Sequence, residues 1–307
     1  MRITLGPVLF NWDPAAWRDF HFRIADEAPV NRVVLGEVVC SKRTPFLVEH
    51  LPAVIERLLA AGKEVALASL ALVTLERERR AMAELAADAS LPVEANDVSI
   101  LGALAGRPHL IGPLVNVYNE ETARWLAARG ARAICLPPEL PGSSIAVIAA
   151  RGGIPVEVFA FGRVPLAISA RCYHARVHGL HKDNCRFVCA QDPDGMPVAT
   201  LDKEPFLTVN GLQTLSHGCA SLIGDLPFLR EAGVTSLRLS PQCCDMVAVA
   251  RIFRDVMDGR MEAGAGSAAL ATAFPGVPFS NGFLHGRPGV EYVAARQHGH
   301  DPRPCPG

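Results

Sequence analysis

Three cysteines lie close together in a stretch of this chain that has little apolar periodicity. Cys172, Cys185 and Cys189 occur in RCYHARVHGLHKDNCRFVC with the spacing C-x12-C-x3-C. Thiolates are the ligands that zinc and iron–sulfur clusters take from proteins. The ordinary alternative for a cysteine is a buried free thiol. The density of thiols in one non-periodic segment favours a metal site over unrelated core residues.

A fourth cysteine, Cys40, directly follows a predicted strand at residues 33–39. The carboxyl ends of parallel strands meet on one face of a barrel, so Cys40 and the cysteine segment can meet in space. Four thiolates suit zinc or an iron–sulfur cluster. Structural zinc sites usually show paired C-x2-C spacings, and this set has none, which favours the cluster. Cys219 is a reserve ligand.

Other residues with reactive or ligating side chains lie near strand ends or in the cysteine segment. Glu37 and Asp97 follow predicted strands and are candidates to line a pocket, with inter-strand hydrogen bonding as the alternative. Arg171 is a candidate for holding an anion, or else part of a solvated face. The segment also contains the histidines His174, His178 and His181. These are either metal ligands or, more commonly, residues that donate hydrogen bonds to the groups around a metal.

The elements that must position these residues alternate between short β-branched runs and longer amphipathic runs. Predicted strands cover residues 3–10, 33–39, 65–70, 92–98, 110–117, 133–136, 156–161, 206–209 and 236–239. Predicted helices lie between them, and Pro52 is expected to kink or break the helix that starts at Pro45. This order indicates parallel strands with crossover helices. The predicted fold is an α/β TIM-like barrel with an inserted cysteine-rich loop at residues 168–196; a doubly wound open sheet is the alternative.

Composition limits the class of protein. The chain has 307 residues, 50% of them hydrophobic, and a formal net charge of −1. We expect one domain over residues 1–295 and a flexible tail at 296–307. Near-neutral charge argues against binding a nucleic-acid backbone, and the apolar runs are too short to span a membrane. Nine cysteines without an export signal indicate a reducing, cytoplasmic compartment.

Several longer strings resemble one known family. EVFAFGRVPLAISARC at 157–172, LGEVVCSKR at 35–43, NVYNEETA at 116–123 and NGFLHGRPGVEYV at 281–293 are similar to the collagenase-like peptidase superfamily. The similarity is strongest to its branch in oxygen-independent ubiquinone biosynthesis. Many superfamily members have a cysteine where this chain has Val164 or Pro165. This chain lacks a cysteine at that position and has Cys40 instead, which resembles the arrangement in that branch.

The resemblance implies a specific activity. It implies a 4Fe-4S cluster on the four cysteines, and a heterodimer with a UbiU-like protein in a hydroxylase complex. That complex would hydroxylate a ubiquinone precursor without O2, with prephenate as the suggested oxygen source. A lipid-binding accessory protein of the pathway is a further implied partner. The sequence assigns no catalytic residue.

The rival functions are a non-catalytic zinc-binding scaffold and a peptidase or RNA-modifying enzyme of the same superfamily. Peptidase activity is not expected, because proteolysis needs an activated nucleophile or a metal-bound water. No motif in the sequence clearly provides either one.

Overall fold

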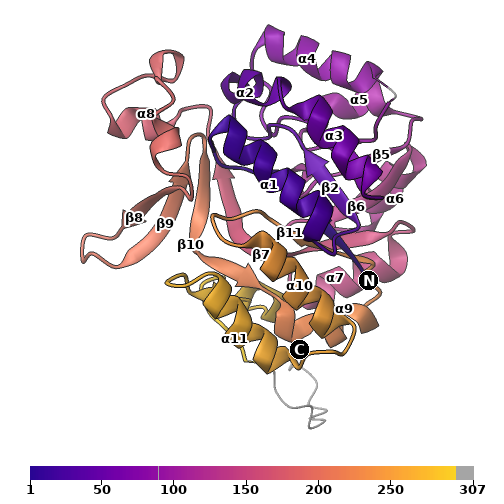
Figure 1. Ribbon diagram of the computed structural model, residues 1–307. Helices are drawn as coiled ribbons and strands as arrows, with labels where there is room; N and C mark the ends of the chain where they lie inside the picture. The colour runs from indigo at the N-terminus through magenta and orange to yellow at the C-terminus, as the bar shows by residue number, and fades with distance from the viewer. Residues whose placement is uncertain (89, 295–307) are drawn as a thin grey trace.

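Eight parallel strands form a closed barrel in the computed structural model, which describes residues 1–88 and 90–294 (Figure 1). Each strand pairs with its neighbour in sequence, and β11 closes the barrel by pairing with both β1 and β7. The predicted (β/α) barrel is therefore confirmed, and the open-sheet alternative is wrong. The barrel strands are β1 (Arg2–Leu5), β2 (Arg32–Leu35), β3 (Glu64–Ala68), β4 (Val93–Ala95), β5 (His109–Ile111), β6 (Ala131–Leu136), β7 (Val156–Ile168) and β11 (Ser236–Leu239).

Helices surround the barrel and cover its apolar outer face. In α1, Asp13 caps the first turn by accepting the amide hydrogens of Ala15 and Ala16. No helix among the described residues is long and apolar enough to cross a membrane. The helices of the barrel are α1 (Pro14–Glu27), α2 (Thr44–Val48), α3 (Leu51–Ala60), α4 (Glu76–Ala87), α5 (Leu101–Leu104), α6 (Glu120–Ala128), α7 (Gly142–Arg151), α9 (Leu226–Glu231), α10 (Met246–Met257) and α11 (Ala263–Ala273).

The two faces of the barrel strands differ in character. Outward residues such as Ile3, Leu5 and Val33 pack with the helices in the main core. Thr4, between two of these residues, points the other way and hydrogen-bonds to Glu157 in β7. The barrel interior thus contains a polar layer that the outer core lacks.

A three-stranded extension projects from one side of the barrel (Figure 1). β7 continues past the barrel and pairs with β10 (Gln213–Ser221). β10 pairs with β9 (Pro205–Asn210), and β9 pairs with β8 (Met196–Ala199). The short β12 (Phe279–Ser280) pairs with β10. The extension presents the cysteine-rich segment beside the barrel.

The cysteine-rich segment is more ordered than the predicted loop 168–196. β7 extends to Ile168, α8 (Tyr173–Val177) and two single turns follow, η4 (Lys182–Asn184) and η5 (Val188–Gln191), and β8 begins at Met196. The predicted tail at 296–307 lies outside the described residues.

Candidate metal centre

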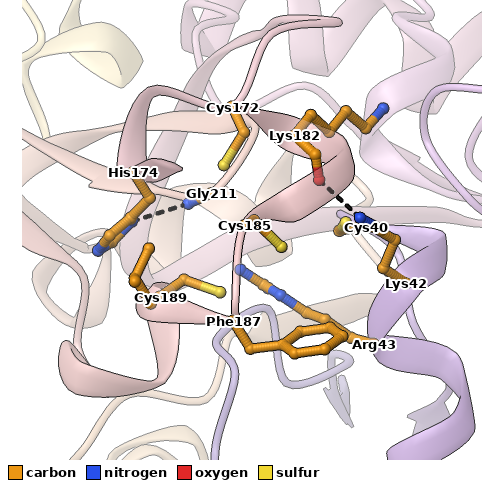
Figure 2. Close-up of a pocket in the computed structure, with 11 residues that line it drawn as sticks. Cys40, Lys42, Arg43, Cys172, His174, Lys182, Cys185, Phe187, Cys189 and Gly211 are labelled. Atoms are coloured by element: carbon orange, nitrogen blue, oxygen red, sulfur yellow. Dashed lines mark hydrogen bonds between the residues drawn. The ribbon is translucent and has the colours of Figure 1, made fainter. Parts of the chain in front are cut away.

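One cavity between the barrel and the cysteine-rich segment is lined by all four cysteines selected from the sequence. Cys40 comes from the loop after β2, whereas Cys172, Cys185 and Cys189 come from the segment between β7 and β8. Their thiol groups point towards the same space (Figure 2). The fold therefore brings together thiols that are far apart in sequence.

Cys40 is positioned by a buried carboxylate. β2 ends at Leu35, and Gly36 turns the chain with a φ of 118°. One oxygen of Glu37 then accepts hydrogen bonds from the amides of Val39 and Cys40, at 2.7 and 2.9 Å. Burial raises the pKa of Glu37, although the charge of Arg43 and these amides oppose the shift. Glu37 thus lies beside the cavity and shapes the loop that holds Cys40.

The other three cysteines are held by local backbone turns. Cys172 caps α8, and its sulfur accepts the amide hydrogen of Ala175 at 3.4 Å. Arg186 and Phe187, between Cys185 and Cys189, both adopt left-handed backbone conformations with φ of 50° and 53°. Such conformations cost about 1 kcal/mol or more each in residues other than glycine and concentrate at functional sites. Here they turn the chain so that both flanking cysteines face the cavity.

His174 fixes the segment in place. It is fully buried, and the Gly211 amide donates a hydrogen bond to Nδ1 at 3.1 Å. The proton on Nε2 is therefore available to Asp192, whose carboxylate lies 2.7 Å away. His174 joins α8 to the turn between β9 and β10, whereas His178 and His181 are exposed.

The cavity also has a cationic wall that the sequence did not indicate. Arg43 is 2% exposed, and its guanidinium donates to the Leu9 carbonyl at 2.9 Å and to Asn210 Oδ1 at 3.0 Å. Burial disfavours its charged form, but the Glu37 carboxylate and the Cys189 thiol outweigh burial and raise the pKa of Arg43. Its position three residues after Cys40, about one helical turn away, is the signal that was available.

The remaining predicted pocket residues lie elsewhere. Arg171 is exposed and lines an open cavity on the outer side of Cys172. Asp97 caps the turn after β4 by accepting the Ser99 amide hydrogen at 2.8 Å. Cys219 does not line the cysteine cavity; it is buried near Gln242, with its sulfur 4.0 Å from Oε1.

The donor set suits a soft metal. Burial raises the pKa of the Cys40 and Cys172 thiols, so a bound metal would have to displace their protons. The Asn11 amide lies 3.5 Å from the Cys189 sulfur, where it can donate a hydrogen bond to a thiolate. No three His, Cys, Asp or Glu side chains of the described residues are gathered closely enough to hold a single metal ion.

An open cavity of about 640 Å³ adjoins this site at the carboxyl ends of β1 and β11. Asn11 and Ala190 belong to its wall, and Asn11 also contacts Cys189. Trp12 and Phe20 form an edge-to-face aromatic pair on the same wall, with ring centres 5.2 Å apart. The cavity lies on the barrel face where the sites of such folds are built.

Fold and site together define a parallel (β/α) barrel protein with a cysteine-lined cavity beside the barrel. Residues 18–294 match the sequence model of Peptidase family U32, and the chain belongs to this family. Family membership confirms the superfamily resemblance seen in the sequence.

Solved structures similar to this chain include the U32 peptidase Mk0906, with 13% identity over 79% of this chain and 93% of that chain, and a TM-score of 0.44. A dihydropteroate synthase from Thermus thermophilus has 15% identity over 87% and 94% of the two chains, with a TM-score of 0.41. A tryptophan synthase complex from Pyrococcus furiosus has 12% identity over 87% and 95%, with a TM-score of 0.40.

Proposed function

We propose that this chain is the iron–sulfur subunit of an oxygen-independent hydroxylation system in ubiquinone biosynthesis, the role of UbiV, and that it acts with a UbiU-like partner. The observation that carries the proposal is the single cavity lined by Cys40, Cys172, Cys185 and Cys189. The pathway and the partner rest on the sequence strings that resemble this branch of the family.

A 4Fe-4S cluster suits the cavity better than one zinc ion does. Zinc requires its thiolate ligands at about 2.3 Å from a common centre. In a cluster, each thiolate binds a different iron, so the sulfur atoms lie farther apart. The described residues hold no tight three-ligand group, while four thiols surround one space. The amides of Asn11 and Ala175 lie close enough to donate to two of the sulfurs, and hydrogen bonds of this kind tune such clusters.

The residues around the four cysteines suit a protected redox centre. When bound, the cluster would supply one-electron transfer, and the four cysteines would hold it. The rings of Phe46 and Phe187, with centres 4.8 Å apart, join α2 to the cysteine-rich segment and limit access of water. The open cavity beside Asn11 gives a substrate or a partner an approach to within one side chain of Cys189. Thiols committed to a cluster are not nucleophiles for proteolysis.

Metal analysis of protein purified under nitrogen tests the proposal. We expect brown protein with iron and acid-labile sulfide in equal amounts. Cys185→Ala should lose at least half of the iron, because it removes one of the four ligands. Cys243→Ala, which removes an exposed thiol outside the cavity, should keep it. Colourless wild-type protein with one zinc per chain would instead establish the scaffold function.

Co-expression with a UbiU-like chain tests the partner. We expect the two chains to elute together in anaerobic size-exclusion chromatography. Elution of this chain as a monomer in the presence of that partner would contradict a stable heterodimer.

A further inference from the structure

A buried guanidinium faces the cysteine cavity without a carboxylate bonded to it. Arg43 is 2% exposed, and the two hydrogen bonds of its side chain go to uncharged groups, the Leu9 carbonyl and Asn210 Oδ1. Its Nε has no hydrogen-bond partner among the described residues. Figure 2 shows the guanidinium among the thiol groups that line the cavity. At least one donor of this buried cation, which lines the cavity, is thus left without a partner in the described part of the chain.

This arrangement requires a negative charge nearby. A guanidinium keeps its proton in proteins, and a buried charge is costly unless an opposite charge compensates it. Glu37 supplies one nearby negative charge, but the structure gives no hydrogen bond between it and Arg43, and one of its oxygens accepts the amides of Val39 and Cys40. The cavity side of the guanidinium otherwise meets thiols, which become negative when they bind a metal.

We propose that Arg43 is a positioning residue that supplies the counter-charge for the metal centre and raises its reduction potential. This inference rests on the proposed function. Four thiolates already make a cluster site negative, and reduction adds one more negative charge. A fixed, poorly screened cation therefore stabilises the reduced state more than the oxidised state. Lys42 also lines the cavity, but its ammonium group donates hydrogen bonds to the carbonyls of Lys182 and Asp183 at 2.6 and 2.8 Å.

The test compares Arg43→Gln with Arg43→Lys. Both variants lose the planar guanidinium group and its paired donors, but only the lysine variant keeps the positive charge. Midpoint potentials are measured by anaerobic redox titration followed by EPR, with iron content and circular dichroism recorded for each protein. We expect Arg43→Gln to shift the reduction equilibrium at least tenfold against the reduced state, which is about 59 mV downward for one electron. Arg43→Lys should stay within half of that shift.

Arg171→Gln is the matched control, because it removes the same charge from an exposed side chain next to Cys172. Water screens that charge, so its midpoint should stay close to that of the wild type. If Arg43→Gln loses its iron while Arg43→Lys keeps it, no midpoint can be compared. The iron contents then support the inference, because only the variant that keeps the positive charge keeps the cluster. An unchanged midpoint in Arg43→Gln, or equal behaviour of the two Arg43 variants, would overturn the inference. Wild-type protein without iron would refute the proposed function and is recognised separately, before any variant is compared.

Discussion

Burial fixes the charge state of a histidine in α1. His21 is 1% exposed and packs against Trp17, with ring centres 4.2 Å apart. Its Nδ1 donates to the Trp17 carbonyl at 2.8 Å, and its Nε2 has no partner among the described residues. Burial lowers the pKa of His21 from 6.5 to about 4, although the hydrogen bond to Trp17 opposes the shift. The folded state therefore holds this ring neutral.

Acid should weaken the fold through His21. Below pH 6.5 the unfolded chain binds a proton at this ring, whereas the folded chain does not until about pH 4. The unfolded state then binds more protons, so the free energy of unfolding falls as the pH falls from 6.5 to 4, by at most about 3 kcal/mol from this group. Urea unfolding across this range should show a flatter profile for His21→Leu. His178→Leu, at an exposed ring, should keep the wild-type slope, and equal slopes in all three proteins would contradict the assignment.

Single residues of the site were predictable where topology alone decides their position. The carboxyl ends of all strands lie on one face of a parallel barrel, so Cys40 and the cysteine-rich segment could be expected on the same face, and there they line one cavity. Arg43 was not predicted as a site residue, although its position one helical turn after Cys40 was a signal, because spacing alone does not show that its side chain is buried. Asp97 and Glu37 both follow a strand and accept the amide hydrogen two residues ahead, but only Glu37 holds a loop that carries a cysteine of the cavity.

At the scale of elements, Gly162 lies where β7 leaves the barrel. The first part of β7, as far as Phe161, pairs with β11. From Phe161 onwards β7 pairs with β10 instead, whose residues from Ser221 back to Gln213 run antiparallel to it. Gly162 has a φ of 123°, and a Cβ atom added there would lie 2.7 Å from Ser240 Cβ. A glycine at this position lets one strand serve both the barrel and the extension that carries the cysteine-rich segment.

Gly162→Ala should therefore destabilise the protein by about 2–4 kcal/mol, from the disfavoured backbone conformation together with the steric clash. Gly179→Ala is the matched control: its φ is 67°, but nothing lies within 4 Å of an added Cβ, so it should cost only about 1 kcal/mol. Denaturant midpoints compare the two variants. A similar loss in both would mean that the approach of Ser240 is unimportant.

Elements with a strong local signal were predictable, and those that depend on distant pairing were not. Pro52 separates α2 from α3 as expected, because proline cannot donate within a helix. The predicted strand at 110–117 ends at Ile111, since Pro113 begins a turn. The extension β8–β10 was only partly expected, because β8 is half exposed and exists through antiparallel pairing with β9.

At the scale of the whole molecule, a buried ionic group joins three barrel strands. Arg238 in β11 donates through Nη1 to Glu94 in β4 at 2.9 Å and through Nε to Glu157 in β7 at 2.6 Å. All three side chains are at most 5% exposed. Burial alone would raise the pKa of Glu157, but the charge of Arg238 and the hydrogen bonds from Thr4 and Arg238 together outweigh burial and lower that pKa. The barrel interior is thus held by an ion pair network across its centre as well as by apolar packing.

Arg238→Met should destabilise the barrel by about 3–5 kcal/mol at pH 7, because it leaves two carboxylates buried without a counter-charge. Arg57→Met, which breaks an exposed pair with Asp26, should change the stability far less, because water screens that pair. The wild type loses the benefit of the ionised Glu157 as the pH falls below its unfolded pKa of 4.5, while in Arg238→Met protonation relieves the uncompensated charge. The stability gap measured by urea unfolding should therefore be largest at pH 7 and narrow below pH 4.5. A gap that stays constant over this range would show that lost packing of the arginine side chain, rather than its charge, causes the loss of stability.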